Sequence, residues 1–553
     1  MAPIAKTRSV TIGWPKEHRN VSKVDGDGDR QSDIRPERRP GRPIRVVLTP
    51  ASVRRSLPCL GAFWALLVAA LAASVSAGAA TPATLTVVGQ SSLGARGMNA
   101  ALTVAGSCAY VGSRSDAASR IVDVSNPASP LVTGQLTKHP GSTPRELRAV
   151  PALHELVVLY YAINGGPNGL DLYRWGTDCK APTLVGHYDF GGHAPHEFYV
   201  WQDPKTPARV LAFVTMFASA GNSLNVIDVS DPTKPALLAG WSAPSSYGYA
   251  PLHSIALSPD GRTAYLSLWT GGLVVADASD FASGAGQPTL RLLTPAAARF
   301  RTPPGNVHSA VPVPGQSLLI TTDERYPSPY GQGCPYGNAH LVDVSNPAKP
   351  TVVSTMAIPE NDPAACAAAG SGTWTSHNPT LTAHLALVTW YSGGIQVFGL
   401  DDVAHPARLA EIRPAGISPT LRDVQLGTTA AMTWSYPVIA AGLIYVVDIN
   451  QGLLVLRYQG PHQDEVSTTA FAEGNSNLVA SRAQSAATPS SAPTATVAPS
   501  SQPTPGAGTS QQSSGALPWL IGGGVFVLAL GLRVAGGVRR RETAKNDRDG
   551  RGG

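Results

Sequence analysis

The stretch IVDVSNP at residues 121–127 returns with little change as IDVSDP at 227–232 and as VDVSNP at 342–347. Weaker copies stand at 275–277 and 397–400. The copies at 227–232 and 275–277 are 49 residues apart, counted from aspartate to aspartate. A period near 50 residues indicates that one supersecondary unit is repeated along the chain.

Each repeat has the same internal order. A short strand and a turn precede an alternating strand such as Ala264–Trp269, and a glycine pair such as Gly271-Gly272 follows. An apolar strand then enters the Asp-Val-Ser-Asn/Asp-Pro turn, where proline ends the strand because it has no N–H to donate. A fourth strand such as Ala236–Trp241 completes the unit. Four antiparallel strands, repeated, predict the blades of a β-propeller.

The number of blades follows from the first strands. They begin near Met98, Arg145, His196, Leu252, Val307, His377 and Thr433. The last unit has only three strands, the third ending at 453–458, and the stretch Thr84–Gly89 resembles the outer strand Thr183–Gly186. We therefore expect an all-β, seven-bladed propeller whose N-terminal strand completes the last blade and removes the open sheet edges.

The repeated Asp-Val-Ser-Asn/Asp-Pro motif resembles that of the LVIVD-repeat family of bacterial exported propellers. The resemblance covers residues 84–460, and Leu172–Asp178 in the second blade departs from it. It implies the propeller fold and export, and it assigns no activity. A looser resemblance, at the level of the fold, links the chain to the bacterial methanethiol oxidases of the selenium-binding-protein family, which are copper propellers.

The N-terminal flank is interpreted as an export signal. Residues 1–56 form a polar, basic extension, which suggests a misassigned start codon, and the apolar run 57–80 has the basic flank and small-residue exit of a signal peptide. A long n-region and an uncleaved anchor are the alternatives.

The C-terminal flank predicts a membrane anchor. Residues 461–515 contain a Ser/Thr/Pro/Ala-rich stretch that is typical of a disordered stalk, because it has no apolar period. The apolar run 516–538 is long enough for one transmembrane helix, and the basic tail 539–553 marks the cytoplasmic side. The propeller is thus expected outside the cytoplasm.

The charge distribution argues against a nucleic-acid partner. The first 55 residues carry 13 Lys/Arg against 6 Asp/Glu, and the last 21 carry 7 against 3. The central residues 56–532 are therefore mildly acidic, with a net charge of about −5 and no basic patch interleaved with aromatic residues.

Four cysteines remain once Cys59 in the signal segment is set aside: Cys108, Cys179, Cys334 and Cys366. They allow three pairings in an oxidising compartment. The turns in which they lie share faces of the predicted propeller in two pairs, so we expect disulfides Cys108–Cys179 and Cys334–Cys366. Four free, buried thiols are the alternative.

Histidines recur at one position of the repeat. They stand at the start of the first strands of four consecutive blades, as His196, His253, His308 and His377. The other three blades place Asn99, Arg145 and Trp434 there, and His193 lies close by as a weaker candidate metal ligand. Since first strands line the centre of a propeller, we expect four imidazoles to converge near its axis.

Converging imidazoles favour copper or zinc, and three histidines with an open position form a known catalytic arrangement. The alternative is that histidine is only the consensus residue of the repeat and bonds neighbouring blades without a metal.

Other candidate residues have weaker support. Glu197 and the run 323–325 are potential acid/base groups, although solvated loop charges are the commoner case. Arg145, Trp434 and Tyr436 are candidates for ligand contact, with core packing as the competing interpretation of the two aromatic residues.

Two functions fit these patterns. The first is a membrane-anchored, extracytoplasmic binding module that recognises a small molecule or a surface protein. The second is a metal-dependent oxidoreductase or hydrolase that uses the ring of histidines. No complete catalytic set is visible in the sequence, which favours the binding module.

Overall fold

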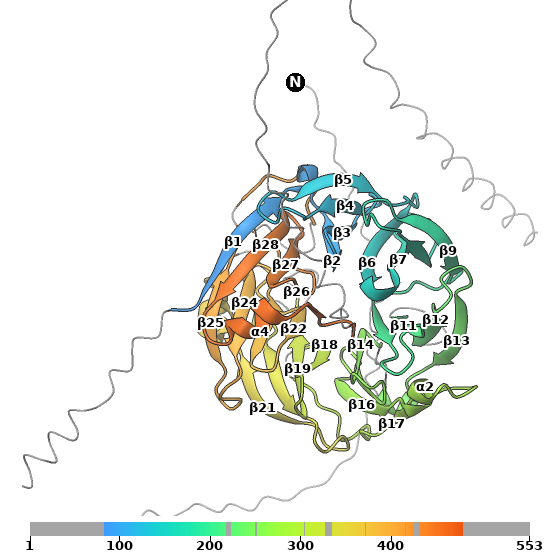
Figure 1. The fold of residues 1–553 in the computed structure, drawn as a ribbon. Coiled ribbons are helices and arrows are strands. Elements are labelled where there is room, and N and C mark those ends of the chain that lie inside the picture. Colours follow the sequence, from blue (N-terminus) through green and yellow to red (C-terminus); the bar gives the residue numbers. More distant parts are fainter. Residues whose placement is uncertain are drawn as a thin grey trace, which may run out of the picture. The chain divides into compact units, whose positions relative to one another are not determined.

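The computed structural model describes residues 82–478, apart from 217–222, 249–250, 303–304, 327–333, 371, 415 and 424–430. The described strands form seven antiparallel sheets arranged as blades around one axis (Figure 1). Within each of the first six blades the four strands follow one another in chain order. The predicted all-β, seven-bladed propeller is confirmed.

The first three blades begin with β2, β6 and β10. Blade one contains β2 (Asn99–Ala105), β3 (Cys108–Ser113), β4 (Arg120–Asp123) and β5 (Leu131–Gln135). Blade two contains β6 (Ser142–Val150), β7 (Glu155–Ala162), β8 (Gly169–Arg174) and β9 (Thr183–Asp189). Blade three contains β10 (Phe198–Gln202), β11 (Val210–Thr215), β12 (Leu224–Asp228) and β13 (Ala236–Trp241).

The next three blades begin with β14, β18 and β22. Blade four contains β14 (Ser254–Leu257), β15 (Thr263–Ser267), β16 (Leu273–Asp277) and β17 (Arg291–Leu292). Blade five contains β18 (Val307–Pro312), β19 (Leu318–Asp323), β20 (Ala339–Asp343) and β21 (Thr351–Met356). Blade six contains β22 (Pro379–Leu381), β23 (Leu385–Thr389), β24 (Ile395–Gly399) and β25 (Ala407–Ile412).

Blade seven has five strands, and short helices lie in loops within and between the blades. It contains β26 (Val438–Ala440), β27 (Leu443–Asp448), β28 (Gly452–Gln459), the N-terminal β1 (Thr84–Ser91) and β29 (Phe471–Glu473). The helices are η1 (Leu93–Ala95), η2 (Pro151–Leu153), η3 (Ser245–Tyr247), α2 (Ser279–Ser283), η4 (Pro359–Asn361), α3 (Pro363–Cys366) and α4 (Gln463–Thr468).

The N-terminal strand closes the ring, as predicted. β1 runs antiparallel to β28, from the pair Thr84↔Gln459 to the pair Ser91↔Leu453. Gly89 sits where this outer strand meets the motif turn of blade one: a Cβ there would lie 2.1 Å from the Pro127 carbonyl oxygen. Only glycine permits such a close approach.

The repeated motif forms the same turn in each strong copy. The serine N–H donates to the side-chain oxygen of the aspartate two residues earlier, at 2.8–2.9 Å, in Asp123–Ser125, Asp228–Ser230 and Asp343–Ser345. This bond satisfies a backbone donor at the point where the strand ends. The motif therefore encodes the exit from the third strand of a blade.

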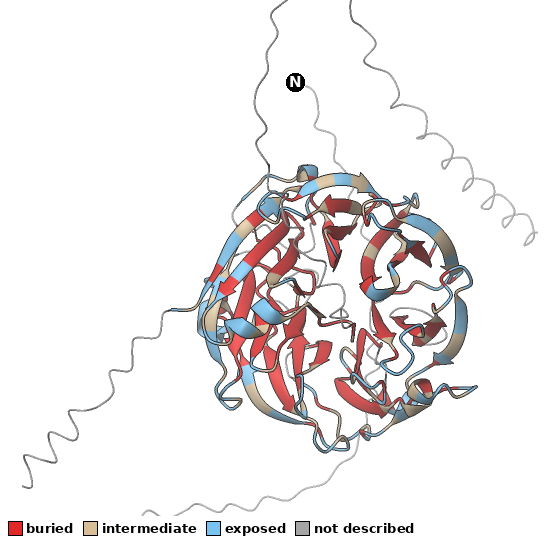
Figure 2. Ribbon diagram, in the orientation of Figure 1, coloured by how far each residue is buried: buried red, intermediate tan, exposed pale blue. Residues whose placement is uncertain are grey.

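Burial falls from the axis outward (Figure 2). Every residue of the inner strand β2 is buried, whereas the outer strand β5 alternates between exposed and half-buried positions. The inner strands are therefore covered on both faces by neighbouring blades, and polar side chains that they carry are held away from water.

The chain continues past the predicted end of the propeller. Residues 461–515 are expected to form a stalk, yet α4 and β29 follow β28, and β29 pairs with the inner strand β26. Asn475 then donates to the Phe198 carbonyl at 2.7 Å, and Asn477 to the Gln202 carbonyl at 2.9 Å. The stalk boundary at 461 is therefore wrong: this segment runs from blade seven to blade three, where the inner strands supply its backbone partners.

Both predicted disulfides, Cys108–Cys179 and Cys334–Cys366, are present. No helix among the described residues is long and apolar enough to cross a membrane. The N-terminal extension 1–56, the signal segment 57–80, the membrane span 516–538 and the tail 539–553 lie outside the described residues.

Candidate functional site

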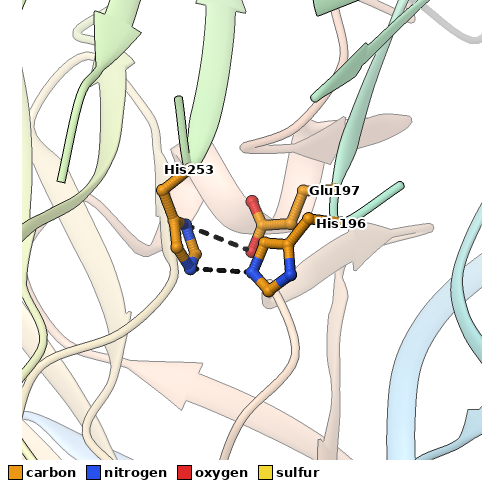
Figure 3. A group of neighbouring side chains, drawn as sticks. All are labelled: His196, Glu197 and His253. Carbon is orange, nitrogen blue, oxygen red and sulfur yellow. Dashed lines mark hydrogen bonds and ion pairs between the residues drawn. The ribbon is translucent and has the colours of Figure 1, made fainter. Parts of the chain in front are cut away.

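Three of the four repeat histidines occupy equivalent backbone positions. The N–H groups of His196, His253 and His377 each donate to the second strand of their own blade, to Thr215, Ser267 and Thr389, at 2.8–2.9 Å. His308 lies at a bulge in β18. The hydrogen bonds between the strands of each blade thereby fix the backbone position of its histidine. Figure 3 shows His196 and His253, with Glu197, facing one another.

The imidazoles form a continuous row. His196 Nε2 lies 2.9 Å from His253 Nε2. Ring centroids are 4.4 Å apart for His196 and His253, 4.1 Å for His253 and His308, and 4.0 Å for His308 and His377. Four blades thus bring into contact a row of side chains whose ends, His196 and His377, are 181 positions apart in the sequence.

Two carboxylates flank the row. Glu197 Oε1 lies 3.6 Å from His308 Nε2 and 4.0 Å from His253 Nδ1. Glu324 follows β19. Its Oε1 lies 3.5 Å from His377 Nε2, and its Oε2 lies 4.0 Å from His308 Nε2. We call the set of His196, His253, His308, His377, Glu197 and Glu324 the axial cluster.

Aromatic residues support the cluster. The Trp269 ring stacks on His253 with a centroid distance of 4.7 Å, and the Tyr391 ring meets His377 edge-on, also at 4.7 Å. Both residues have positive φ, 47° and 30°, at the same point of their blades, just before a glycine-rich turn. A non-glycine residue in this region costs free energy. In both blades this backbone conformation directs the aromatic ring toward a histidine of the row.

Glu324 is held by two tyrosines. The Tyr326 hydroxyl donates to its Oε1 at 2.7 Å, and the Tyr391 hydroxyl donates to the same oxygen. On the opposite flank, Glu197 Oε2 is buried and has no hydrogen-bond partner among the described residues. A buried carboxylate oxygen in this state is costly unless a cation or a donor meets it.

Burial sets the charge state of the cluster. It lowers the pKa of His253 to about 3, and the nearby Arg145 charge adds to the effect. It likewise lowers the pKa of His196, His308 and His377 well below the usual histidine value. The imidazoles are therefore neutral at pH 7, which is the form that binds metal ions.

The carboxyl groups shift in the opposite direction. Burial raises the pKa of Glu197 well above its usual range, and the neighbouring Glu146 carboxylate adds to the rise. Burial also raises the pKa of Glu324, against the lowering effect of its tyrosine donors. A nearby cation would therefore stabilise the ionised form of each carboxyl group.

The donor set fits a transition metal. Ligand atoms of His196, Glu197 and His253 lie within 4.8 Å of one another, and so do those of His253, His308 and Glu324. Two nitrogens in a tetrahedral zinc site are about 3.3 Å apart, since Zn–N bonds are ~2.05 Å. The observed 2.9 Å between His196 Nε2 and His253 Nε2 needs only a small separation.

The other residues singled out in the sequence lie beside the axial cluster or away from it. Arg145 lies over the Trp434 ring at 5.1 Å, and Trp434 lies beside His377 at 5.1 Å between centroids. Asn99 bonds the backbone of Ile449. His193 is exposed, and no described ion pair or ring contact joins it to the axial cluster.

Charged side chains of blade two form a second buried group. Arg148 Nη2 lies 3.1 Å from Glu146 Oε2, and Arg148 Nε lies 3.1 Å from Glu473 Oε1 on β29. All three side chains are at most 2% exposed. We call this group the axial network; it ties to β6 the segment that runs from blade seven to blade three (the crossing segment, residues 471–478). The charges of Glu146 and Arg148 also act on the Glu197 carboxyl group.

A family model described as LVIVD repeat matches residues 96–137, 216–240 and 340–357. The chain contains LVIVD repeats. These matches fall in blades one, three and five, where the strong copies of the motif stand. No curated protein matches the sequence.

Solved structures resemble this LVIVD-repeat propeller only remotely. The C-terminal WD40 domain of Sif2 is 9% identical over 69% of this chain and 100% of its own, with a TM-score of 0.43. Kuenenia stuttgartiensis hydrazine synthase is 14% identical over 66% and 96%, with a TM-score of 0.42. A structural-genomics protein from Lactobacillus plantarum is 13% identical over 57% and 84%, with a TM-score of 0.40. At these TM-scores the likenesses carry no argument about function.

Sequence reasoning misjudges the acidic residues of this LVIVD-repeat propeller. It favours solvated loop charges for Glu197 and for 323–325, and this is wrong, because Glu197 is 3% exposed and Glu324 1%. Glu146 and Arg148 are missed altogether. The available signal was two charged residues, two positions apart, inside an inner strand that must be buried.

Proposed function

We propose that the axial cluster binds a transition metal ion, copper or zinc, and that the protein is a metal-dependent enzyme acting on a small molecule outside the cytoplasm. The observation that carries the proposal is a row of four neutral imidazoles in contact, three of them buried and His196 half-buried, flanked by two buried carboxylates. Imidazole and carboxylate together suit these metals.

The two possible sets of ligands, one with His196 and Glu197 and the other with His308 and Glu324, both include His253. We therefore propose that one ion is bound per chain. A bound copper or zinc ion would supply redox or Lewis-acid chemistry at the axis. The chain's own residues then have distinct parts: Glu197 and Glu324 are positioned to accept or return a proton, and Tyr391 and Tyr326 fix the orientation of Glu324. Trp269 shields one face of His253 from water.

The proposed location outside the cytoplasm is supported by chemistry as well as by the flanking sequences. The domain holds two disulfides, Cys108–Cys179 and Cys334–Cys366, which persist mainly in oxidising compartments. The apolar segments 57–80 and 516–538 have the sequence patterns of an export signal and of a membrane anchor, which support this location.

The metal proposal is tested by titrating the metal-free full chain with Cu²⁺ or Zn²⁺ in a calorimeter. The double variant His253→Ala/His308→Ala is expected to lose one saturable binding event. His193→Ala is the matched control, because that histidine lies outside the axial cluster, and it is expected to bind as the wild type does. Equal binding by the wild type and the double variant would contradict the proposal.

A second candidate is a binding module displayed at the cell surface. The Ser/Thr/Pro/Ala-rich stretch 482–515 and the apolar run 516–538 favour it, since as a stalk and an anchor they would hold a rigid propeller away from the membrane. Such a module needs no axial histidines. Partner capture that survives His253→Ala/His308→Ala, with metal binding lost, would favour this candidate over the enzyme.

A further inference from the structure

A second group of metal-ligating side chains lies on the surface, at the turn between the first two strands of blade six. His384 is in the turn between β22 and β23, and His462 and Glu465 come from the start of α4, some 80 residues later. Donor atoms of these three residues all lie within 4.8 Å of one another. We call this set the blade-six clasp; it shares no residue with the axial cluster.

Both histidines point a ring nitrogen at one carboxylate oxygen. His384 Nδ1 contacts Glu465 Oε1, and His462 Nδ1 lies 3.9 Å from the same atom. The two rings are stacked, with centroids 4.6 Å apart and planes inclined by 16°. The other carboxylate oxygen, Glu465 Oε2, accepts the His384 N–H at 3.0 Å and the Thr382 hydroxyl. Glu465 is thereby fixed with Oε1 facing both imidazoles.

An outer partner selects the tautomer of His462. Its Nε2 lies 2.8 and 2.9 Å from the two oxygens of Asp401, which follows β24. A carboxylate in this position accepts a hydrogen bond from Nε2–H. The lone pair of the neutral ring is then on Nδ1, the nitrogen that faces Glu465. Metal-ligating histidines usually donate their second N–H to such a carboxylate. This carboxylate–histidine arrangement is what separates the clasp from an ordinary surface ion pair.

The clasp has the ligand number and access that a zinc ion requires. His384, His462 and Glu465 are 46%, 27% and 19% exposed at the side chain, so an ion can enter and keep a water molecule as its fourth ligand. Two histidines and one glutamate with an open position are a known set for Zn²⁺.

We propose that the blade-six clasp is a Zn²⁺ site in which His384, His462 and Glu465 are the ligands and Asp401 orients His462. The proposal is independent of the axial cluster. Because α4 leads directly into β29 and the crossing segment, an ion held here ties that segment to blade six. The ion therefore stabilises the part of the chain that reaches Glu473 and Arg148 at the axis.

The test uses the full chain and Zn²⁺ alone. Bound zinc is counted after equilibrium dialysis for the wild type, for His384→Ala/His462→Ala, and for the control His405→Ala, whose histidine pairs with Asp402 outside the clasp. The clasp variant is expected to bind one equivalent less than the wild type, and the control the same number. Since only the difference is read, the result does not depend on whether the axial cluster binds zinc.

Two further readouts separate a built site from loose surface binding. Asp401→Asn is expected to weaken zinc binding at the clasp by about 10- to 100-fold, the usual loss for an outer-shell partner. Zinc is also expected to slow amide hydrogen exchange in residues 462–478 of the wild type and of His405→Ala, and to leave it unchanged in the clasp variant. Equal zinc counts in wild type and clasp variant, or exchange that zinc slows equally in both, would overturn the proposal.

Discussion

Replacing Arg148 by methionine tests the axial network in isolation from the metal. Arg148 is completely buried, and its guanidinium lies 3.1 Å from Glu146 Oε2 and 3.1 Å from Glu473 Oε1. Methionine keeps most of the side-chain volume and removes the charge. Two carboxyl groups that are at most 2% exposed are then left without their cation.

The expected loss is large and depends on pH. Breaking a buried pair by removing one partner costs about 3–5 kcal/mol of the free energy of unfolding. Burial already raises the pKa of Glu473 to about 7 and raises the pKa of Glu146, with Arg148 opposing both shifts. Without Arg148 both pKa values rise further, so the folded variant takes up protons more readily than the unfolded chain. The deficit relative to wild type is therefore largest near pH 8 and narrows as the pH falls toward 5.

The assay is unfolding in guanidinium chloride, followed by tryptophan fluorescence at pH 8 and pH 5.5. The triple variant Arg148→Met/Glu146→Gln/Glu473→Gln is the matched control, because it removes all three charges, and it is expected to recover most of the loss. A loss below about 1 kcal/mol in Arg148→Met, or a loss of the same size at both pH values, would refute the reasoning.

Three further outcomes are expected. Cys108→Ser/Cys179→Ser opens a 71-residue loop, which the chain-entropy relation converts to a loss of about 4.4 kcal/mol, measurable as a lower denaturation midpoint; an unchanged midpoint would count against it. The raised pKa of Glu473, about 7 in the folded state, stabilises the fold by about 3 kcal/mol below pH 4.5, and this is lost as the pH rises through 7. Glu473→Gln is therefore expected to flatten the dependence of stability on pH in this window, and an unaltered slope would contradict the assignment. Deleting 84–91 exposes the edge of β28 and is expected to produce oligomers in light scattering, whereas a monomer of wild-type stability would show that closure of the ring is dispensable.

The fold was predictable because its signals are local and repeated. The Asp-Val-Ser-Asn/Asp-Pro motif bonds within itself, from Ser125 to Asp123 and in the same way in the other copies, so the turn it forms can be read from seven residues. The register of His196, His253, His308 and His377 followed from the same periodicity. The closing strand was predictable because Thr84–Gly89 has the sequence pattern of an outer strand. The last repeat lacks such a strand, and β1 supplies it.

The rest depends on contacts between distant residues that have no repeat to reveal them. Glu324 is one of several acidic residues in loops, and only the position of His377 and Tyr391 in the next blade shows that it is buried at the axis. β29 has three residues and takes its partners from β26, so nothing local distinguishes it from the Ser/Thr-rich sequence that follows. The clasp, likewise, joins His384 to a helix some 80 residues away.

The central claim is that the axial cluster holds a metal ion, and anomalous diffraction tests it most directly. Crystals of the full chain grown with one to two equivalents of Zn²⁺, measured on both sides of the zinc absorption edge, locate the ion without reference to activity. The account predicts an anomalous peak within bonding distance of His253 and of at least one of His196, His308 and Glu197. A map with zinc peaks only on the surface, and none at the axis, would contradict it.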